Sequence, residues 1–226
     1  MNTISKYLIL VFASCLIAVG GYFGYRHYIL KQAQKNVGEL NINVTIYEDV
    51  DKGLSDIISL HLSKMHYLGD LILEEIEDDN TVEYCVFNSK FCTEFTSNID
   101  SLAFMSPHSI NKKKKGSLFL SNSIPNYEEK IAMNDTILEK VKYKRFAISS
   151  KTEYSVFYLQ DNLNIPYSFN KQAEKEFNGT ITRIDTYNIN EDKFISVILE
   201  SNNKIQKSFY ENLSNNYFKY KKHEKI

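Results

Sequence analysis

The sequence predicts an α+β protein, in which an N-terminal transmembrane helix precedes a mixed or antiparallel β-sheet domain with a few helices. Residues 7–25 contain no charged side chain, which is typical of a membrane span. The last third of the chain alternates apolar and polar residues with the period of a β-strand. The 16 Tyr and 14 Phe residues suit half-buried, pleated surfaces.

The apolar segment reads YLILVFASCLIAVGGYFGY and follows a short flank, residues 1–6. As a helix it would extend about 28 Å at roughly 1.5 Å per residue, close to the hydrocarbon thickness of a bilayer. We therefore interpret residues 7–25 as an uncleaved anchor that contacts the lipid bilayer. A secretory signal cleaved before Gly21 and a lipoprotein signal at Cys15 are the alternatives.

The side of the membrane is open to two interpretations. More basic residues follow the segment than precede it, which by the positive-inside rule would leave the main domain in the cytosol. A short basic leader before an apolar stretch is also the form of an export signal. The cysteines favour export, so we expect an extracytoplasmic domain, in the periplasm or on the outer surface.

Cys85 and Cys92 lie in the segment EYCVFNSKFCTEF, whose flanks alternate with strand period. A turn at Asn88 and Ser89 would fold this segment into a hairpin and bring the two cysteines opposite each other. We therefore predict a disulfide between them, which implies an oxidising compartment. Two reduced thiols are the alternative. Their spacing lacks the close pairs that a zinc site needs.

In the first part of the chain, the spacing of apolar residues predicts alternating strands and helices. A juxtamembrane helix is expected over residues 26–38, followed by a soluble domain over 39–218. Apolar residues alternate in a strand over 41–48 and recur at helical spacing in an amphipathic helix over 54–65. The next segment, 71–77, is predicted as a strand, with continuation of the helix as the alternative.

The pattern from residue 82 onward predicts mostly strands. The cysteine hairpin spans 82–96, and a loop with a lysine run at 112–115 makes residues 106–116 a candidate domain boundary. The elements expected after it are a short strand at 117–120, one or two helices at 127–141, strands at 143–149, 154–159, 180–189 and 194–199, a helix at 204–213, and a frayed basic tail at 219–226.

No residue stands out as catalytic, cofactor-binding or metal-binding. His61 and His66 are five apart, whereas metal-binding helical pairs are three or four apart. The chain contains no nucleophile elbow, Walker loop or dinucleotide fingerprint. The acidic run Glu74, Glu75, Glu77, Asp78 and Asp79 is interpreted as a solvated turn, and the lysines at 112–115 as a solvated loop.

The sequence thus favours a single-pass, membrane-anchored envelope protein with a non-enzymatic accessory, interaction or sensing role. Its expected partners are the bilayer, through residues 7–25, and another membrane or envelope protein. A formal net charge of −1 argues against nucleic acid. The alternatives are an anchored or secreted hydrolase or transferase whose site is assembled only in the fold, and a module that binds an apolar ligand.

Overall fold

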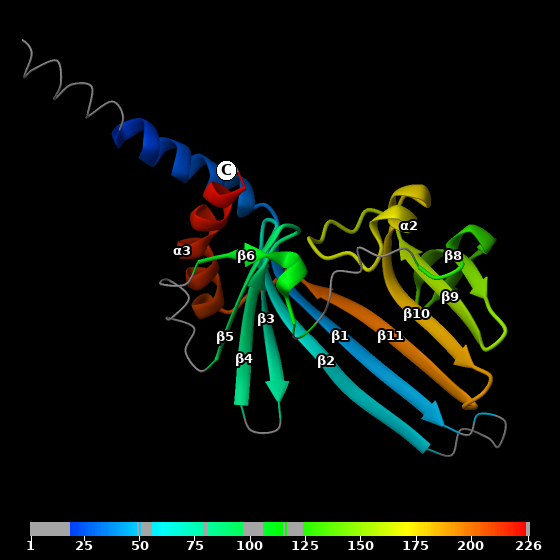
Figure 1. Ribbon diagram of the computed structural model, residues 1–226. Helices are drawn as coiled ribbons and strands as arrows, with labels where there is room; N and C mark the ends of the chain where they lie inside the picture. Colours follow the sequence, from blue (N-terminus) through cyan, green and yellow to red (C-terminus); the bar gives the residue numbers. More distant parts are fainter. Residues whose placement is uncertain are drawn as a thin grey trace, which may run out of the picture.

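The computed structural model describes residues 19–48, 50, 56–78, 81–96, 106–114, 116 and 124–224. These residues form an 11-stranded antiparallel sheet with a few helices (Figure 1). After helical residues 19–33, the elements are β1 (Val37–Glu48), β2 (Asp56–Leu68), β3 (Leu71–Asp78), β4 (Thr81–Phe87), β5 (Phe91–Thr96), β6 (His108–Ser109), η3 (Ile110–Lys112), η4 (Tyr127–Glu129), β7 (Ile131–Leu138), β8 (Val141–Ser149), β9 (Glu153–Gln160), α2 (Lys171–Glu176), β10 (Thr180–Asn188), β11 (Lys193–Asn202) and α3 (Lys207–His223).

The sheet consists of two meanders joined at its centre. The strand order is β6-β5-β4-β3-β2-β1-β11-β10-β9-β8-β7, so that the first and last strands of the chain pair with each other. Their register runs from Glu39 opposite Asn202 to Tyr47 opposite Phe194. This pairing makes one continuous sheet from the two halves of the chain.

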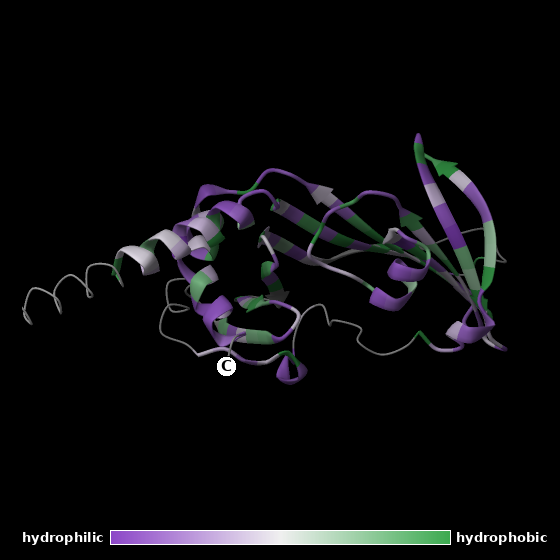
Figure 2. Cartoon of the chain, turned by 90° about the horizontal axis from the view of Figure 1, so that it is seen from above, coloured by the Kyte–Doolittle hydropathy of each residue, from purple (hydrophilic) through white to green (hydrophobic). Residues whose placement is uncertain are grey.

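Apolar residues lie on both faces of the sheet, and Figure 2 shows their alternation with polar residues along the strands. One face carries the larger core, which includes Leu40, Ile42, Met65, Phe87 and Leu199. The other face carries a smaller core around Leu68, Leu71, Leu73, Val86 and Phe95, which α3 covers with Leu213, Tyr217 and Tyr220. Helix α3 therefore packs on the face opposite the larger core.

The N-terminal helical residues and α3 lie side by side at one end of the sheet (Figure 1). Phe218 of α3 makes edge-on ring contacts with Tyr22 and Tyr25, with centroids 5.2 and 6.1 Å apart. Gln34 donates a hydrogen bond to Tyr210 of α3. Ala33 is buried in the smaller core. The end of the N-terminal helix is thus fixed to the domain by side-chain packing.

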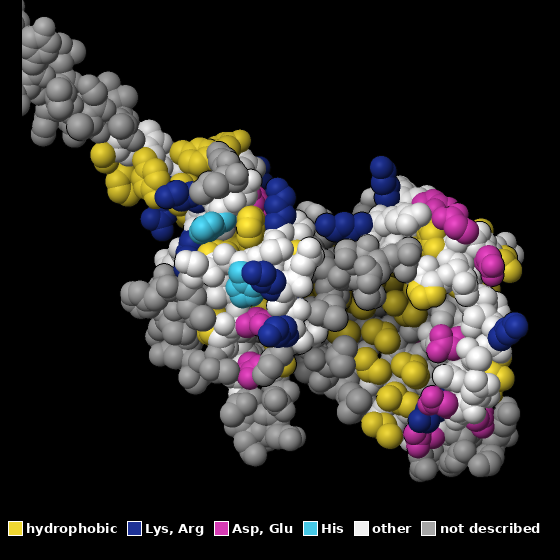
Figure 3. Space-filling model, in the orientation of Figure 1, with side chains coloured by type: hydrophobic (Ala, Val, Ile, Leu, Met, Phe, Trp, Pro, Cys, Tyr) yellow, Lys and Arg dark blue, Asp and Glu magenta, His cyan; other side chains and the backbone are white. Residues whose placement is uncertain are grey.

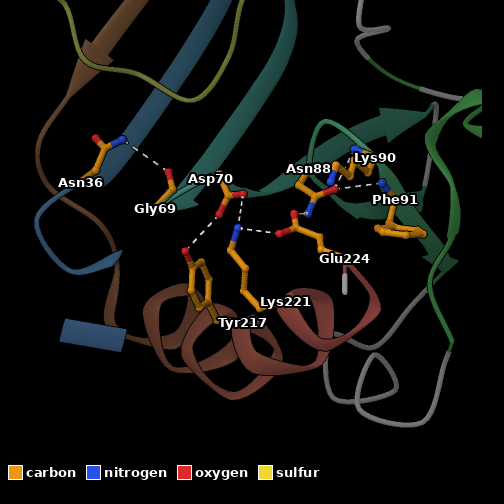
Figure 4. A network of polar contacts seen from close by, with 9 residues as sticks. All are labelled: Asn36, Gly69, Asp70, Asn88, Lys90, Phe91, Tyr217, Lys221 and Glu224. Atoms are coloured by element: carbon orange, nitrogen blue, oxygen red, sulfur yellow. Dashed lines mark hydrogen bonds and ion pairs between the residues drawn. The ribbon is translucent and has the colours of Figure 1, made fainter. Parts of the chain in front are cut away.

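A polar network fastens the C-terminal end of α3 to two hairpin turns of the sheet (Figure 4). The ammonium group of Lys221 lies 2.6 Å from Asp70 and 3.0 Å from Glu224. Tyr217 donates a hydrogen bond to Asp70, and Asn88 donates one to Glu224. The predicted frayed tail is therefore wrong as far as His223, since α3 continues through these residues.

The helix predicted over 54–65 is wrong, because residues 56–65 belong to strand β2. Strand β2 has apolar residues on both faces: Met65 contributes to the larger core and Leu68 to the smaller one. Its pairing with β1 also shifts register between Ile42 and Asn43. Two covered faces and a bulge interrupt simple alternation, and the resulting apolar spacing resembles that of a helix.

The helix predicted over 127–141 is also wrong. A single 3-10 turn, η4, precedes strand β7, which pairs with β8 at the edge of the sheet. The turn residues Glu139 and Lys140 have φ values of 48° and 71°. A two-residue hairpin with two positive φ values usually contains Asn or Gly, so this turn lacked its usual sequence signal.

The other predicted strands are confirmed within one to four residues at their ends: 41–48, 71–77, the hairpin over 82–96, 143–149, 154–159, 180–189 and 194–199. The sheet, expected to be mixed or antiparallel, is antiparallel throughout its described pairings. The strand predicted at 117–120 and residues 7–18 of the predicted anchor lie outside the described residues. Among the helices that the structure does describe, none is long and apolar enough to cross a membrane.

Candidate functional site: an apolar hollow on the sheet

Hydrophobic side chains gather in a hollow over the central strands β1, β10 and β11 (Figure 3). The hollow lies on the face of the larger core, because Val44 and Ile46 alternate in phase with buried Leu40 and Ile42 along β1. We use the name apolar hollow for this surface, whose incompletely buried residues are Val44, Ile46, Ile58, Ile184, Ile195 and Val197.

The strand register arranges these residues in rows across the sheet. Val44 lies opposite Val197, which lies opposite Ile184. In the next row, Ile58 lies opposite Ile46, which lies opposite Ile195. Directly opposite residues of antiparallel strands are close enough for their side chains to touch. Each row therefore forms a continuous apolar strip that crosses at least three strands.

Burial decreases along the hollow. Ile42 and Leu199, at its inner end, are only 1% and 4% exposed. Val44 and Val197 are half-buried, and Ile58 is 42% exposed. The core of the protein thus opens onto the surface through this face, and contiguous exposed apolar surface of this kind usually marks a binding site.

The hollow offers apolar side chains but few free backbone groups. Strands β1, β10 and β11 each have a hydrogen-bonded strand on both sides, and the edges of the described sheet are the distant strands β6 and β7. An extended peptide adds to a sheet at an edge, where unpaired N–H and C=O groups remain. The centre of this sheet has no such edge.

A polar rim borders the hollow one row beyond Ile46 and Ile195. Lys193 of β11 lies 3.4 Å from Glu48 and 3.2 Å from Glu191. Asn188 of β10 is opposite both Lys193 and Glu153. These five residues border the apolar rows at this end of the hollow, and three of them are acidic.

At the β9 end of the hollow there is a small open pocket of about 90 Å³. Drug-sized ligands usually occupy pockets of roughly 300–1,000 Å³, so this one has room for a small group only. Its lining residues are Ile124, Pro125, Asn126, Ile148, Ser150, Glu153, Ser155 and Phe157.

A buried ion pair lies on the same face, toward β4. Lys113 and Glu74 are 2.9 Å apart, with side chains 1% and 0% exposed. Ser63 donates a hydrogen bond to the second carboxylate oxygen of Glu74. Gly116 has a φ of 71° and approaches Glu74 so closely that a Cβ atom at this position would collide with the carboxylate.

The solvated loop predicted for 112–115 and the solvated turn predicted for the acidic run are therefore wrong for Lys113 and Glu74. Glu75, on the other face, is 2.6 Å from His66 and also pairs with Lys64. A run of like charges in the sequence does not show which of its side chains is buried in the fold. Tertiary packing buries Lys113 and Glu74 as an ion pair.

Cys85 and Cys92 are free and fully buried in the larger core. The expected register is wrong: Cys85 lies opposite Glu94 and Cys92 opposite Phe87, so the cysteines are diagonal neighbours. The turn is displaced by one residue, to Ser89 and Lys90, because Asn88 pairs with Phe91 through a backbone hydrogen bond. The side-chain oxygen of Asn88 accepts hydrogen bonds from the N–H groups of Lys90 and Phe91 and stabilises this turn. The disulfide, and the export inferred from it, remain predictions.

Burial also disfavours the thiolate form of both cysteines. It raises the pKa of Cys92 to about 11 and raises the pKa of Cys85 further, although the charge of Lys113 opposes both shifts. Thiolate is the nucleophilic and metal-binding form of cysteine. At neutral pH these two side chains act as small apolar groups of the core.

The four histidines whose side chains are described do not converge on one site. His66 is buried beneath α3, where its ring stacks on Phe209 with centroids 3.7 Å apart. His27 is exposed on the N-terminal helix, and His108 and His223 lie in other elements. The side chain of His61 is outside the described residues. Within the described part of the chain, no group of three or more His, Cys, Asp and Glu side chains could hold a metal ion.

No family model and no curated protein matches the sequence. Among solved structures, the chain is similar to PNGF-II in a C2 space group, with 8% identity over 76% of this chain and 29% of that chain, at a TM-score of 0.31. It thus spans less than a third of PNGF-II. A DUF1329 family protein from Desulfovibrio piger ATCC 29098 is similar at 8% identity over 78% of this chain and 89% of that chain, at a TM-score of 0.28. Both likenesses are too distant to assign an activity or a ligand.

Proposed function

We propose that this protein is a membrane-anchored, non-enzymatic binding module that holds the acyl chain of a lipid in its apolar hollow. The observation that carries the proposal is the pair of apolar rows, Val44–Val197–Ile184 and Ile58–Ile46–Ile195, which continue the core to the surface. Each methylene group removed from water contributes about 0.8 kcal/mol when fully buried, so even a partly covered chain can bind.

The central position of the hollow favours an acyl chain over a peptide. A peptide laid on these strands would bring its own N–H and C=O groups onto apolar side chains. Leaving such groups without hydrogen bonds costs roughly 1–3 kcal/mol each by protein mutational data. An acyl chain has no N–H or C=O groups along its length, so it gives up no hydrogen bonds when it leaves water.

Membrane anchoring would place the hollow beside a supply of lipids. The described end of the predicted anchor supports this part of the proposal, since Val19, Tyr22, Phe23 and Tyr28 are 49–60% exposed. Exposed aromatic residues next to basic ones are typical of the membrane–water interface. Packing of this helix on α3 would hold the domain close to the bilayer.

We further propose that the domain is extracytoplasmic, as the short basic leader ahead of the apolar segment suggests. A lipid held in the hollow has to be delivered or received. An envelope protein that exchanges the lipid is therefore part of the proposal.

The test is photo-crosslinking of the full-length chain in nanodiscs that contain a lipid with a photoactivatable acyl chain, with adducts located by mass spectrometry. We expect adducts on β1 and β11. Ile46→Asp should lower them about tenfold, because it places a carboxylate against the chain. Thr45→Asp, on the opposite face of the same strand, is the matched control and should leave them unchanged.

Adducts on residues 7–25 provide a separate readout of anchoring in every variant. If the wild-type chain is labelled only on residues 7–25, the proposed acyl-chain site is wrong, whereas the proposed membrane anchor is retained. If those residues remain unlabelled and the protein leaves the nanodisc, the anchor is wrong.

A further inference from the structure

The outer row of the hollow changes from apolar to polar toward β9. Ile195 lies opposite Thr186, and Thr186 lies opposite Ser155. The two hydroxyl groups are 2.9 Å apart and share one hydrogen bond. Because each hydroxyl carries one hydrogen, this bond leaves the second hydrogen available to an acceptor such as an ester oxygen.

The small pocket continues this row. Ser155 lies opposite Ile148, and both residues line the pocket together with Phe157. Its floor is therefore apolar and joins the hollow, whereas its outer side carries Ser150 and Glu153. A ligand with an apolar chain and a small polar end would therefore fit, with its chain on the hollow and its polar end in the pocket.

The charge at this end of the hollow is negative. Glu153 is exposed, and its carboxylate has no hydrogen-bond or ion-pair partner among the described residues. Elsewhere on the rim, Lys193 is already shared between Glu48 and Glu191. A clustered negative potential attracts cations and repels anions.

We propose that the pocket is the headgroup end of the lipid site, and that it takes an ammonium headgroup held by the carboxylate of Glu153. The ester region of the lipid then lies by Ser155 and Thr186, and the acyl chain lies on the apolar rows. This inference rests on the proposed acyl-chain site and adds the class of lipid that the site selects.

The test compares two photoactivatable lipids with the same acyl chain, phosphatidylethanolamine and phosphatidylglycerol, each in nanodiscs with the full-length chain. Wild-type adducts on β1 and β11 should be about three- to fivefold more abundant with the ethanolamine lipid, as expected for an exposed ion pair. Glu153→Gln should remove this preference. Glu139→Gln, an exposed glutamate in the β7–β8 turn, is the control and should retain it.

Equal yields from the two lipids, or a preference that survives Glu153→Gln, would overturn the headgroup assignment and leave the acyl-chain site intact. Absence of adducts from the hollow with both lipids would overturn the acyl-chain site and the headgroup assignment with it. Melting curves of each variant in the same nanodiscs show whether the fold is retained.

Discussion

At the scale of single residues, the most unusual feature is the pair of buried charges on the larger-core face. Glu74 and Lys113 lie 2.9 Å apart among apolar groups that include the ring of Phe87, 4.9 Å from the ammonium group. Breaking a buried ion pair by removing one partner costs about 3–5 kcal/mol, although replacing both partners can be neutral.

Lys113→Met should therefore lower the free energy of unfolding by about 3–5 kcal/mol. Lys112→Met changes an exposed lysine of the same run and should alter it by less than about 0.5 kcal/mol. Denaturant titration of the detergent-solubilised chain measures both. Equal effects of the two substitutions would show that Lys113 is not a buried partner of Glu74.

The two core cysteines predict a defined labelling pattern. In a Cys15→Ser background, neither Cys85 nor Cys92 should react with a maleimide while the protein is folded, because both are fully buried. With the register of the structure the two thiols stay free, so both should react after denaturation without a reductant. Labelling that requires a reductant would instead demonstrate the disulfide, and the β4–β5 register would have to slide by two residues to accommodate it.

Glu75 should contribute to the acid sensitivity of the protein. Partial burial opposes ionisation, but His66 and Lys64 outweigh it and hold the pKa of Glu75 below its usual value of 4.5. A lowered pKa contributes stability above the unfolded value, and this stability is lost as pH falls through the folded value. Below about pH 4.5, Glu75→Gln should therefore lose less stability than the wild type. If plots of unfolding free energy against pH run parallel for the wild type and Glu75→Gln, the contribution assigned to Glu75 is wrong.

At the scale of elements, α3 is attached to the sheet by packing along its length and by a polar clamp at its end. Tyr220 is 1% exposed; its hydroxyl donates a hydrogen bond to the carbonyl oxygen of Val86 and accepts one from the hydroxyl of Thr93. The clamp adds Lys221 between Asp70 and Glu224 (Figure 4). Because the same helix contacts the N-terminal helix, its attachment also fixes the predicted anchor to the domain.

Lys221→Met should loosen the last turns of α3. The lysine and Asp70 are partly exposed, so we expect a loss of about 1 kcal/mol and faster hydrogen exchange after Tyr217. Lys222→Met changes the exposed neighbour on the same helix and should leave exchange unchanged. Similar exchange in both variants would mean that the clamp adds no stability.

At the scale of the whole molecule, the pairing of β1 with β11 holds the two meanders together. It is a long central ladder between segments from opposite ends of the described domain. The hollow is built at this junction, because its rows take residues from β1 and β2 on one side and β10 and β11 on the other. The proposed binding site and the fold therefore depend on the same contact between the two halves of the sheet.

The domain should consequently unfold in one cooperative transition. Hydrogen exchange of β3 and β4, in one meander, should report the same free energy of opening as β8 and β9, in the other. Two separate transitions would instead support a boundary near residues 106–116.

Elements whose signals are local could be predicted from the sequence alone. Alternation or a clear turn identified β1, the β4–β5 hairpin and strands β8–β11, because period two and the turn residues act over a few positions. Three features depend on tertiary packing instead: β2 is a strand, the cysteines are diagonal neighbours across the β4–β5 hairpin, and Lys113 is buried. The apolar hollow belongs to this second group. It exists because distant strands pair in one register, and register between distant segments is a property of the folded sheet that no single stretch of sequence encodes.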